Sequence, residues 1–467
     1  MSKEKHTLGA EAIYDARTLG LPRMLILGLQ HMFAMFGATV LVPILVSNNY
    51  GMPLSIQTTL FFAGIGTLIF HVCSKLKIPA FLGSSFAFLG GFQAVSELNV
   101  GKFADMTGAE KLPYAMGGIV VAGVMYILVA LLFKIVAARK VMRFFPPIVT
   151  GPMIILIGLN LAGTAVQNAQ TCWPLALLSI VVIIVANIWG KGMIKIIPIL
   201  LGVVIPYIVA AALGMVDFSG AAAEQVIGLP QFVIAKFDIT AILVMAPIAV
   251  AAMMEHIGDI SAISATCERN FIEDPGLHRT LLGDGLATAV AGLFGGPANT
   301  TYGENTGVLA LSRVYDPNVV RLAAVYAIVL SFSPLFDALV NSIPAAIVGG
   351  VSFILYGMIS AVGIRNVVEN KVDLTNSRNL IIAAVILVCG LGFSSGITFY
   401  IGGTAITLTA MAIAAIAGVA LNAILPGNDY VFGTDAKGDG SANLGTYKAL
   451  DRKRQPGHSV LAVFLHL

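Results

Sequence analysis

Apolar runs long enough to cross a lipid bilayer follow one another from about residue 22 to residue 425. A membrane-spanning helix needs about 20 mainly apolar residues. Hydrophobic residues make up 57% of the chain and charged residues only 11%, which leaves too little charge to cover a soluble globule. The sequence therefore predicts an all-α polytopic membrane protein with 14 transmembrane segments. These segments are 22–46, 56–74, 79–96, 112–135, 147–166, 173–190, 194–214, 239–264, 277–294, 301–314, 319–339, 343–362, 379–397 and 401–425.

The positive residues test this count. If the N-terminus is cytoplasmic, all but three of the 27 Lys and Arg residues fall on the cytoplasmic side, the exceptions being Lys102, Lys111 and Lys236. Such a bias is the positive-inside rule, and one missed span would invert every later loop. We therefore expect a protein of the cell membrane with cytoplasmic tails at 1–21 and 426–467.

Other classes of function find little support in the composition. The net charge of +3 is too small to indicate nucleic-acid binding, and the four cysteines stand singly, without the spacing of a disulfide framework or a metal site. No set of nucleophile and base is apparent, which argues against a membrane-embedded enzyme. We expect no cofactor and no metal.

Two pairs of matching motifs indicate an internal repeat. Ser84-Ser85-Phe86 in the third segment matches Thr300-Thr301-Tyr302 in the tenth, and Phe145–Gly151 at the fifth matches Ile343–Gly349 at the twelfth. Fourteen segments form two sets of seven, and because seven is odd the second set must enter the membrane upside down. The sequence thus predicts 7+7 inverted repeats, the architecture of many secondary transporters.

The stretch Gly295–Gly307 is rich in Gly, Pro and hydroxyl groups, and it lies between apolar runs. Backbone that cannot form an unbroken helix is tolerated at membrane depth only when it is buried in protein or lines a polar cavity. The third and tenth segments are therefore predicted to contain short extended pieces. We interpret them as two halves of one binding site.

Three carboxylates lie inside predicted segments. Glu255 and Asp259 are four residues apart, which puts both on one helix face, and Glu304 follows the second break. An acid away from water can bind or release a proton near neutral pH, so these residues are candidates for proton coupling. Carboxylates also accept hydrogen bonds from the N–H groups of a heterocycle, and Phe86 and Tyr302 offer rings to a flat ligand.

These residues carry a resemblance to a known family. Glu304-Asn305-Thr306-Gly307, followed by Ser312-Arg313, resembles the signature of the nucleobase-ascorbate transporter family, also called nucleobase-cation symporter 2. Gln30–Thr39, Phe81–Phe88 and Glu255–Gly258 are similar to the bacterial uracil permeases within that family. The resemblance extends from the first segment to the fourteenth.

The resemblance implies proton-coupled uptake of a nucleobase by a homodimer. It also implies a core domain formed by 22–135 and 239–339, and a gate domain formed by 147–214 and 343–425. By motif position, Glu255 and Glu304 would hydrogen-bond the base.

The resemblance assigns further roles. The backbones at Phe86 and Gly303 would bind the carbonyls of the base, and Tyr302 and Tyr356 would line the pocket. One departure bears on the substrate, because Asp259 stands where some uracil permeases have His and purine-transporting relatives commonly have Asp. A xanthine or urate permease of the same family therefore stays open beside a uracil permease. An anion transporter or channel of the same architecture is the alternative from another class.

Overall fold

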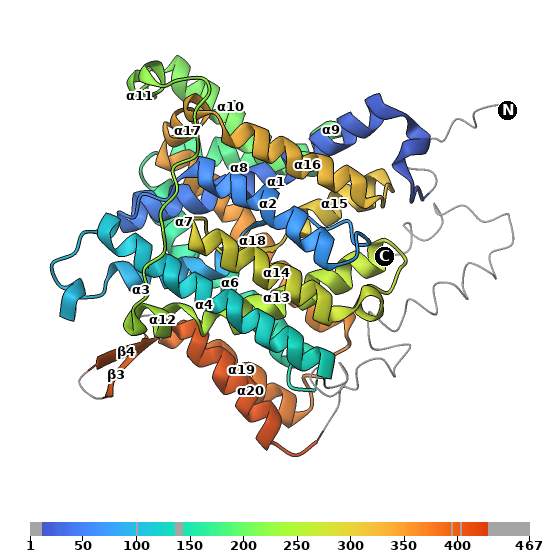
Figure 1. Ribbon diagram of the computed structural model, residues 1–467, viewed down its shortest axis with the longest axis vertical. Helices are drawn as coiled ribbons and strands as arrows, with labels where there is room; N and C mark the ends of the chain where they lie inside the picture. The colour runs from blue at the N-terminus through green and yellow to red at the C-terminus, as the bar shows by residue number, and fades with distance from the viewer. Residues whose placement is uncertain (1–11, 100, 136–142, 394–395, 402–403, 428–467) are drawn as a thin grey trace, which may run out of the picture.

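The computed structural model describes residues 12–427, apart from 100, 136–142, 394–395 and 402–403. The predicted tails therefore lie outside the described residues at 1–11 and from 428 onward. The described chain is mostly helical, with four short strands (Figure 1).

One group of long helices packs together on one side of the molecule and contains helices from both halves of the sequence. Helix α14 packs against α4 and α2, and α16 packs against α2 and α1. The bounds are α1 (Leu21–Tyr50), α2 (Ile56–Cys73), α4 (Gly108–Ile135), α14 (Leu277–Leu293) and α16 (Pro317–Ser331). Helices α12 (Ile239–Met245) and α13 (Ile248–Thr266) complete this group, since α12 and α13 both contact α4.

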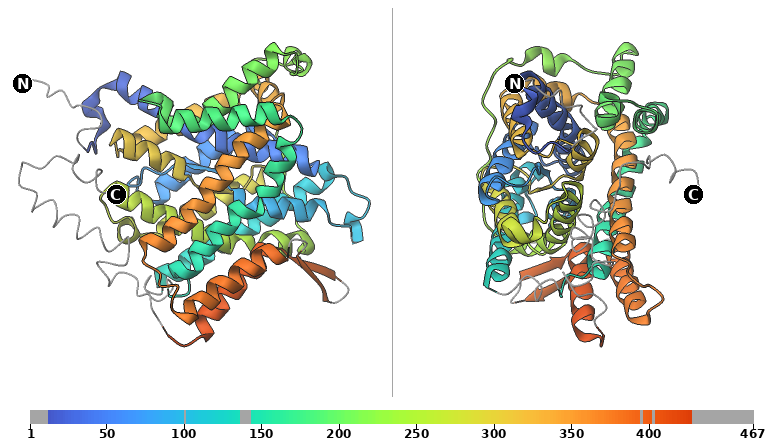
Figure 2. Two further views of the ribbon diagram at one scale, coloured as in Figure 1. Left: turned by 180° about the vertical axis from the view of Figure 1, so that it is seen from behind. Right: turned by 90° about the vertical axis from the view of Figure 1, so that its right-hand side faces the viewer.

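A second group packs around α18. This helix contacts α6, α7 and α8, while α10 packs on α8 and α19 packs on α6 and α20. The bounds are α6 (Pro147–Asn160), α7 (Ala162–Ala169), α8 (Trp173–Ile188), α9 (Met193–Ile196), α10 (Pro198–Ala212), α18 (Ala345–Glu369), α19 (Ser377–Gly392) and α20 (Ala410–Ile424). The right-hand view of Figure 2 shows the two groups side by side.

Shorter elements interrupt the first group where the sequence predicts breaks. One break consists of β1 (Leu82–Ser84), the 3-10 turn η2 (Phe86–Phe88) and α3 (Leu89–Ser96), and the other of β2 (Asn299–Thr301) and α15 (Gly303–Ser312). The remaining short elements are η1 (Ala16–Leu19), η3 (Gly101–Phe103), α11 (Ser219–Ala223), η4 (Ile272–Gly276) and α17 (Pro334–Asn341).

Local sequence explains where the helices begin and end. The Ser55 side chain accepts a hydrogen bond from the Thr58 backbone N–H, which caps the start of α2. Helix α1 carries Pro22 in its first turn and ends at Gly51, whose φ of 63° is the left-handed conformation that glycine adopts at low cost. Thr409 caps α20 through the N–H of Ala412.

The second group of helices contains one feature that differs from the prediction. Residues 379–397 and 401–425 are predicted as two adjacent spans, but β3 (Ile397–Ile401) and β4 (Thr404–Leu408) form an antiparallel hairpin between α19 and α20. Both runs are rich in β-branched or aromatic residues and Gly402-Gly403 lies between them, which is a strand pattern. The hydropathy count treated this pattern as part of a membrane span. Strand β4 contacts α12 of the first group.

An extended linker, 224–238, joins α11 to α12 and runs along the first group (Figure 1). Its backbone N–H groups donate to carbonyls of three different elements: Gly228 to Phe332, Val233 to Phe294 and Lys236 to Pro113. At the other end of the molecule, Ile13 forms a parallel bridge with Val314. The described part of the N-terminal tail is therefore packed on the protein.

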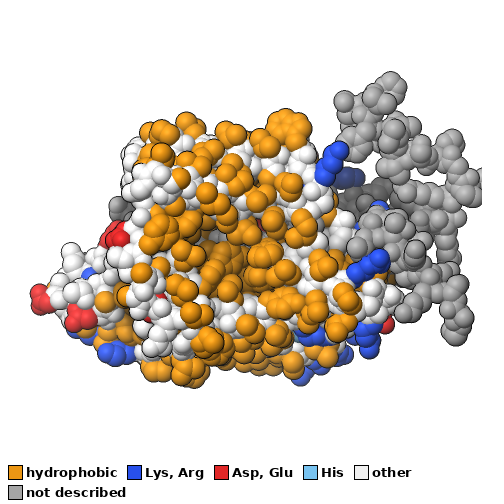
Figure 3. Space-filling model, turned by 90° about the horizontal axis from the view of Figure 1, so that it is seen from above, with side chains coloured by type: hydrophobic (Ala, Val, Ile, Leu, Met, Phe, Trp, Pro, Cys, Tyr) orange, Lys and Arg blue, Asp and Glu red, His pale blue; other side chains and the backbone are white. Residues whose placement is uncertain are grey.

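The described helices agree with a multi-pass membrane protein. Six are long and apolar enough to cross a membrane, or seven if α16 and α17, which are bent by 88°, form one span. Five shorter apolar helices stand at other predicted segments. Figure 3 shows one face of the molecule covered by hydrophobic side chains, with blue Lys and Arg side chains gathered mainly at its right-hand end. The count of 14 segments rests on the sequence.

Candidate functional site

The two breaks meet. Strands β1 and β2 pair antiparallel, with Leu82 opposite Thr301 and Gly83 opposite Thr300. Two flanking hydrogen bonds extend the pairing, from the Ser85 N–H to Ala298 O at 2.8 Å and from the Tyr302 N–H to Phe81 O at 3.0 Å. Segments more than 200 residues apart are thus brought together in the interior of the protein.

A helical turn begins immediately after each strand. Phe86 is the first residue of η2 and Gly303 the first residue of α15, and neither N-terminus is capped by the side chain of the preceding residue. The first N–H groups of a helix have no partner within the helix and attract electronegative atoms. The arrangement therefore presents two sets of backbone donors on either side of the paired strands.

The ring of Tyr302 interlocks the two breaks. Its hydroxyl donates to the Ser84 carbonyl oxygen at 2.9 Å and lies 3.2 Å from the Ser84 hydroxyl, which in turn donates to Thr39 O at 2.8 Å. A Cβ atom at Gly83 would lie 2.4 Å from two atoms of this ring. Only glycine at 83 leaves room for the ring.

Three carboxylates line the inner part of a cavity next to this ring. Glu255 and Asp259 project from α13 and Glu304 from the first turn of α15. We call it the carboxylate cavity; its volume is about 290 Å³, close to the lower end of the ~300–1,000 Å³ typical of small-molecule sites. Among the described residues, Glu255 Oε2 is buried without a hydrogen-bond partner. An acceptor held in this way can receive an N–H group from a ligand.

The carboxylate cavity extends from the interior to an exposed end of α18. Phe86, Thr300 and Tyr302 are buried at its inner end. Arg365 and Glu369, whose side chains are more than half exposed and 3.6 Å apart, line its outer end. The site is thus open to one side of the molecule.

Most of the predicted site residues come together in this cavity. Glu255, Asp259, Glu304, Phe86, Tyr302 and Gly303 all line it. Tyr356 does not; it lies behind Phe86, with the two rings edge to face and their centroids 5.9 Å apart. The place of Tyr356 at the site is indirect in this conformation, and the functional roles of all seven residues stay predictions.

Behind β2 lies a buried polar pair that the sequence did not reveal. His256 Nδ1 is 3.0 Å from Asp284 Oδ2 and 2.8 Å from Thr301 Oγ1, and neither the His256 nor the Asp284 side chain is exposed to solvent. Asp284 does not line the carboxylate cavity. The pair ties α13, α14 and β2 together.

The second group of helices supplies cavity residues that sequence reasoning missed. Asn366 of α18 and Thr150 of α6 both line the cavity, and the Thr150 hydroxyl donates to Asn366 Oδ1 at 3.3 Å. Thr150 belongs to the repeated motif Phe145–Gly151, so a signal was present for it. Asn366 carries none, because its proximity depends on how α18 packs.

Comparisons with known proteins place the chain among transporters. A family described as the permease family matches residues 22–399. The uracil permease of Bacillus caldolyticus is 43% identical over 430 residues, which cover 89% of this chain and 94% of that protein. The uracil permease of Bacillus subtilis (strain 168) is 39% identical over 446 residues, which cover 91% and 97%.

A solved structure shares the fold. The transmembrane domain of a cyanobacterium bicarbonate transporter superimposes with a TM-score of 0.56 at 16% identity, covering 82% of this chain and 98% of that domain. At this identity the likeness concerns the fold alone.

Proposed function

Because the chain belongs to the permease family of nucleobase-ascorbate transporters, we propose that it is a uracil:proton symporter of the cytoplasmic membrane. It imports uracil by alternating access and is not an enzyme. The observation that carries the proposal is the carboxylate cavity, where hydrogen-bond acceptors and backbone donors converge beside buried aromatic rings.

The chemistry of the cavity matches a planar base with N–H donors and carbonyl acceptors on its edge. Glu255 and Glu304 accept from the ring N–H groups, and the first backbone N–H groups at Phe86 and Gly303 donate to the carbonyl oxygens. The Phe86 ring, supported from behind by Tyr356, covers a face or edge of the base. Support comes from 43% identity to a uracil permease.

Proton coupling follows from the three acids. Glu255, Asp259 and Glu304 line one cavity inside a membrane protein, and like charges so placed disfavour simultaneous ionisation. At least one of these acids is therefore suited to hold a proton. Binding of a base changes which acid is protonated, and this exchange couples uracil to the proton.

The packing supports two inverted repeats of seven segments. In a 7+7 repeat each segment corresponds to the one seven positions later, so α2 (segment two) corresponds to α14 (segment nine), and α4 (segment four) corresponds to α16 (segment eleven). The contact of α2 with α16 should therefore have a counterpart in a contact of α14 with α4, and both contacts are present. The same holds for three more contacts: α8–α10, α1–α10 and α8–α18 have counterparts in α19–α20, α13–α20 and α19–α6, respectively. The antiparallel pairing of β1 with β2 agrees with an inversion.

The two groups of helices correspond to the proposed domains. The first group is the core domain, formed by spans one to four and eight to eleven, and the second is the gate domain. Nearly all residues of the carboxylate cavity come from α13, α15 and β2 of the core and from α6 and α18 of the gate. Movement of the core against the gate would then open the site to either side.

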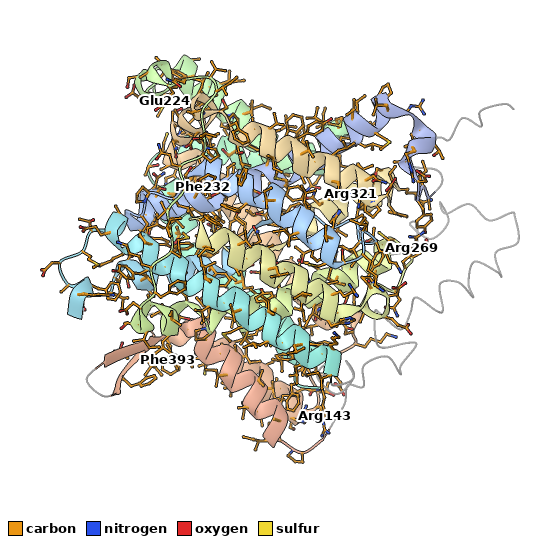
Figure 4. The ribbon with its side chains drawn as sticks, in the orientation of Figure 1. Arg143, Glu224, Phe232, Arg269, Arg321 and Phe393 are labelled. Atoms are coloured by element: carbon orange, nitrogen blue, oxygen red, sulfur yellow. The ribbon has the colours of Figure 1, made fainter. Side chains whose placement is uncertain are left out.

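The orientation rests on the positive residues. Arg143, Arg269 and Arg321 lie toward one end of the molecule, whereas Glu224 and Phe232 lie toward the other (Figure 4). Phe145 lines the outer part of the carboxylate cavity and stands two residues after Arg143. With the positive end in the cytoplasm, the cavity is open inward and both termini are cytoplasmic. The homodimer expected from the resemblance stays a prediction.

The experiment is uptake of labelled uracil by proteoliposomes under an imposed proton gradient. Glu255→Gln and Glu304→Gln keep the size of each side chain but remove the titrating group, so we expect each to abolish proton-driven uptake while the protein remains inserted. Glu97→Gln, an exposed residue at the end of α3 that does not line the cavity, makes the same chemical change and is the control; it should transport normally. Full proton-driven transport by both glutamine variants would refute the assigned roles.

Substrate choice is tested in the same assay. Excess unlabelled xanthine should leave uracil uptake intact; strong competition would favour the xanthine or urate permease instead. The alternative from another class is an anion transporter, since a bicarbonate transporter has a similar fold. Three carboxylates facing the site disfavour an anion, because they would repel it.

A further inference from the structure

A second cavity lies on the opposite side of Glu304. This side cavity has a volume of about 250 Å³ and lies between α1 and α15 of the first group and the α8–α10 region of the second. Its lining consists of Phe33, Ala34, Asn187, Lys195, Ile197, Pro198, Ile199, Leu200, Glu304, Gly307, Val308, Leu311 and Met358.

Glu304 belongs to both cavities. Of the four acids that line the carboxylate cavity, it is the one that also lines the side cavity. Met358 of α18 is the other residue common to the two linings, so it separates them at the point where Glu304 stands. Glu304 therefore stands between the two cavities and lines both.

The side cavity connects Glu304 with an exposed polar surface. Asn187 and Lys195 line it and are exposed at the connection between α8 and α10, which the positive-inside rule assigns to the cytoplasmic surface. Gly307, one turn after Glu304, has no side chain to narrow the passage, and a Cβ atom built there would meet no atom within 4 Å. The cavity is thus open along the face of α15.

The lining suits water better than a nucleobase. Between its two polar ends the wall is formed by apolar side chains such as Phe33, Leu200 and Val308, which offer no partners to the edge of a base. Water finds partners at Glu304, at the exposed end, and at the first-turn N–H groups of Ile199 and Leu200, because α10 has no side-chain cap. A water molecule occupies roughly 30 Å³, so several fit.

We propose that Glu304 exchanges its proton with solvent through the side cavity while uracil occupies the carboxylate cavity. In the release step the Glu304 carboxylic acid becomes a carboxylate, and its proton passes to water in the side cavity and leaves past Asn187 and Lys195. Substrate and proton then travel by different routes from a shared residue. This inference rests on the proposed symport.

The experiment fills the side cavity. Gly307→Leu places a side chain in its open space, and Gly357→Leu is the matched control. Gly357 is also a helical glycine whose Cβ would meet nothing within 4 Å, but it is exposed on α18 and lines neither cavity. Each variant is reconstituted and measured in two modes: net uracil uptake driven by a proton gradient, and exchange of labelled for unlabelled uracil at equal pH.

Exchange needs no net proton release, so the two modes separate the routes. We expect Gly307→Leu to lower net uptake at least tenfold while exchange stays within twofold of the wild type, and Gly357→Leu to retain both. If Gly307→Leu leaves both modes unchanged, the proton leaves through the carboxylate cavity; if both modes fall together, the side cavity belongs to the substrate route. Either result overturns the inference. Absence of proton-driven uptake in the wild type would instead defeat the proposed function.

A labelling measurement covers the case in which Gly307→Leu does not fold. Gly307→Cys and Ser261→Cys, the latter lining the carboxylate cavity, are treated with a membrane-impermeant cationic thiol reagent, and modification at each position is read by mass spectrometry. We expect saturating uracil to protect position 261 and to leave position 307 reactive. A thiol at position 307 that does not react, or that uracil protects, would overturn the inference.

Discussion

The tight contact between Gly83 and Tyr302 leads to a prediction that can be worked out in detail. In Gly83→Ala, the new methyl carbon would start 2.4 Å from ring atoms Cε2 and Cζ of Tyr302 and 2.7 Å from Thr39 Oγ1. Carbon atoms in contact prefer separations of about 3.5–4.0 Å. The ring must therefore move by more than about 1 Å from the added methyl group.

The ring cannot move freely. The hydroxyl of Tyr302 donates a hydrogen bond to Ser84 O. Only 4% of the residue is exposed, and it lies beside the carboxylate cavity. Overpacking a well-packed interior costs about 1–3 kcal/mol, and a buried hydroxyl left without its partner costs about 1–3 kcal/mol more. We expect a total of about 2–6 kcal/mol, distributed between the free energy of unfolding and the free energy of uracil binding.

The assay is uracil binding to purified protein, together with thermal unfolding in detergent. If about 1.4 kcal/mol of the strain falls on Tyr302 in the bound state, the Kd for uracil rises tenfold. Gly90→Ala is the matched control, because Gly90 follows the same break but its Cβ would meet nothing within 4 Å. A Gly83→Ala protein with the stability and uracil affinity of the Gly90→Ala protein would refute the reasoning.

Two further predictions concern the stability of the fold. Thr301→Val removes the hydroxyl 2.8 Å from His256 Nδ1 and should lower the free energy of unfolding by about 1–3 kcal/mol, whereas Thr300→Val, whose Oγ1 has no partner among the described residues, should change it little. Lys102 lies 2.9 Å from Asp238, whose pKa is raised by burial but lowered overall by hydrogen bonds from Lys102 and the Thr240 N–H. A lowered acid pKa stabilises the fold at neutral pH, and the effect is lost as pH falls through that pKa. At pH 7 the free energy of unfolding of Lys102→Met should therefore be lower than that of the wild type by less than about 1 kcal/mol, and this difference should shrink at pH 3. Thermal unfolding measures both values, and a difference that grows on acidification would contradict the reasoning.

The sequence predicted the local features of the site well. The breaks at Ser84 and Thr300 could be recognised because Gly, Pro and hydroxyl residues interrupt apolar runs, and two such interruptions inside a membrane protein have to satisfy each other's backbone. The shared face of Glu255 and Asp259 follows from helical spacing alone. These properties depend on neighbours in the chain.

Features that depend on packing could not be predicted in the same way. Asn366 reaches the cavity only because α18 packs against α6, and the pairing of His256 with Asp284 joins two helices whose register no single sequence specifies. The side cavity is a gap between helices, so no motif announces it. The β3–β4 hairpin was missed for a different reason, since Ile, Thr, Phe and Tyr are equally suited to a strand and to a lipid-facing helix.

That hairpin has a mechanical consequence. It extends from α19 and α20 of the second group of helices, yet β4 contacts α12 of the first group, and the linker 224–238 also joins the two groups. Phe393, just before the hairpin, lies at the opposite end of α19 and α20 from Arg143 (Figure 4). If the two groups of helices move against each other as proposed, β4 must slide across α12 or separate from it when the far side opens, so this contact would resist the motion.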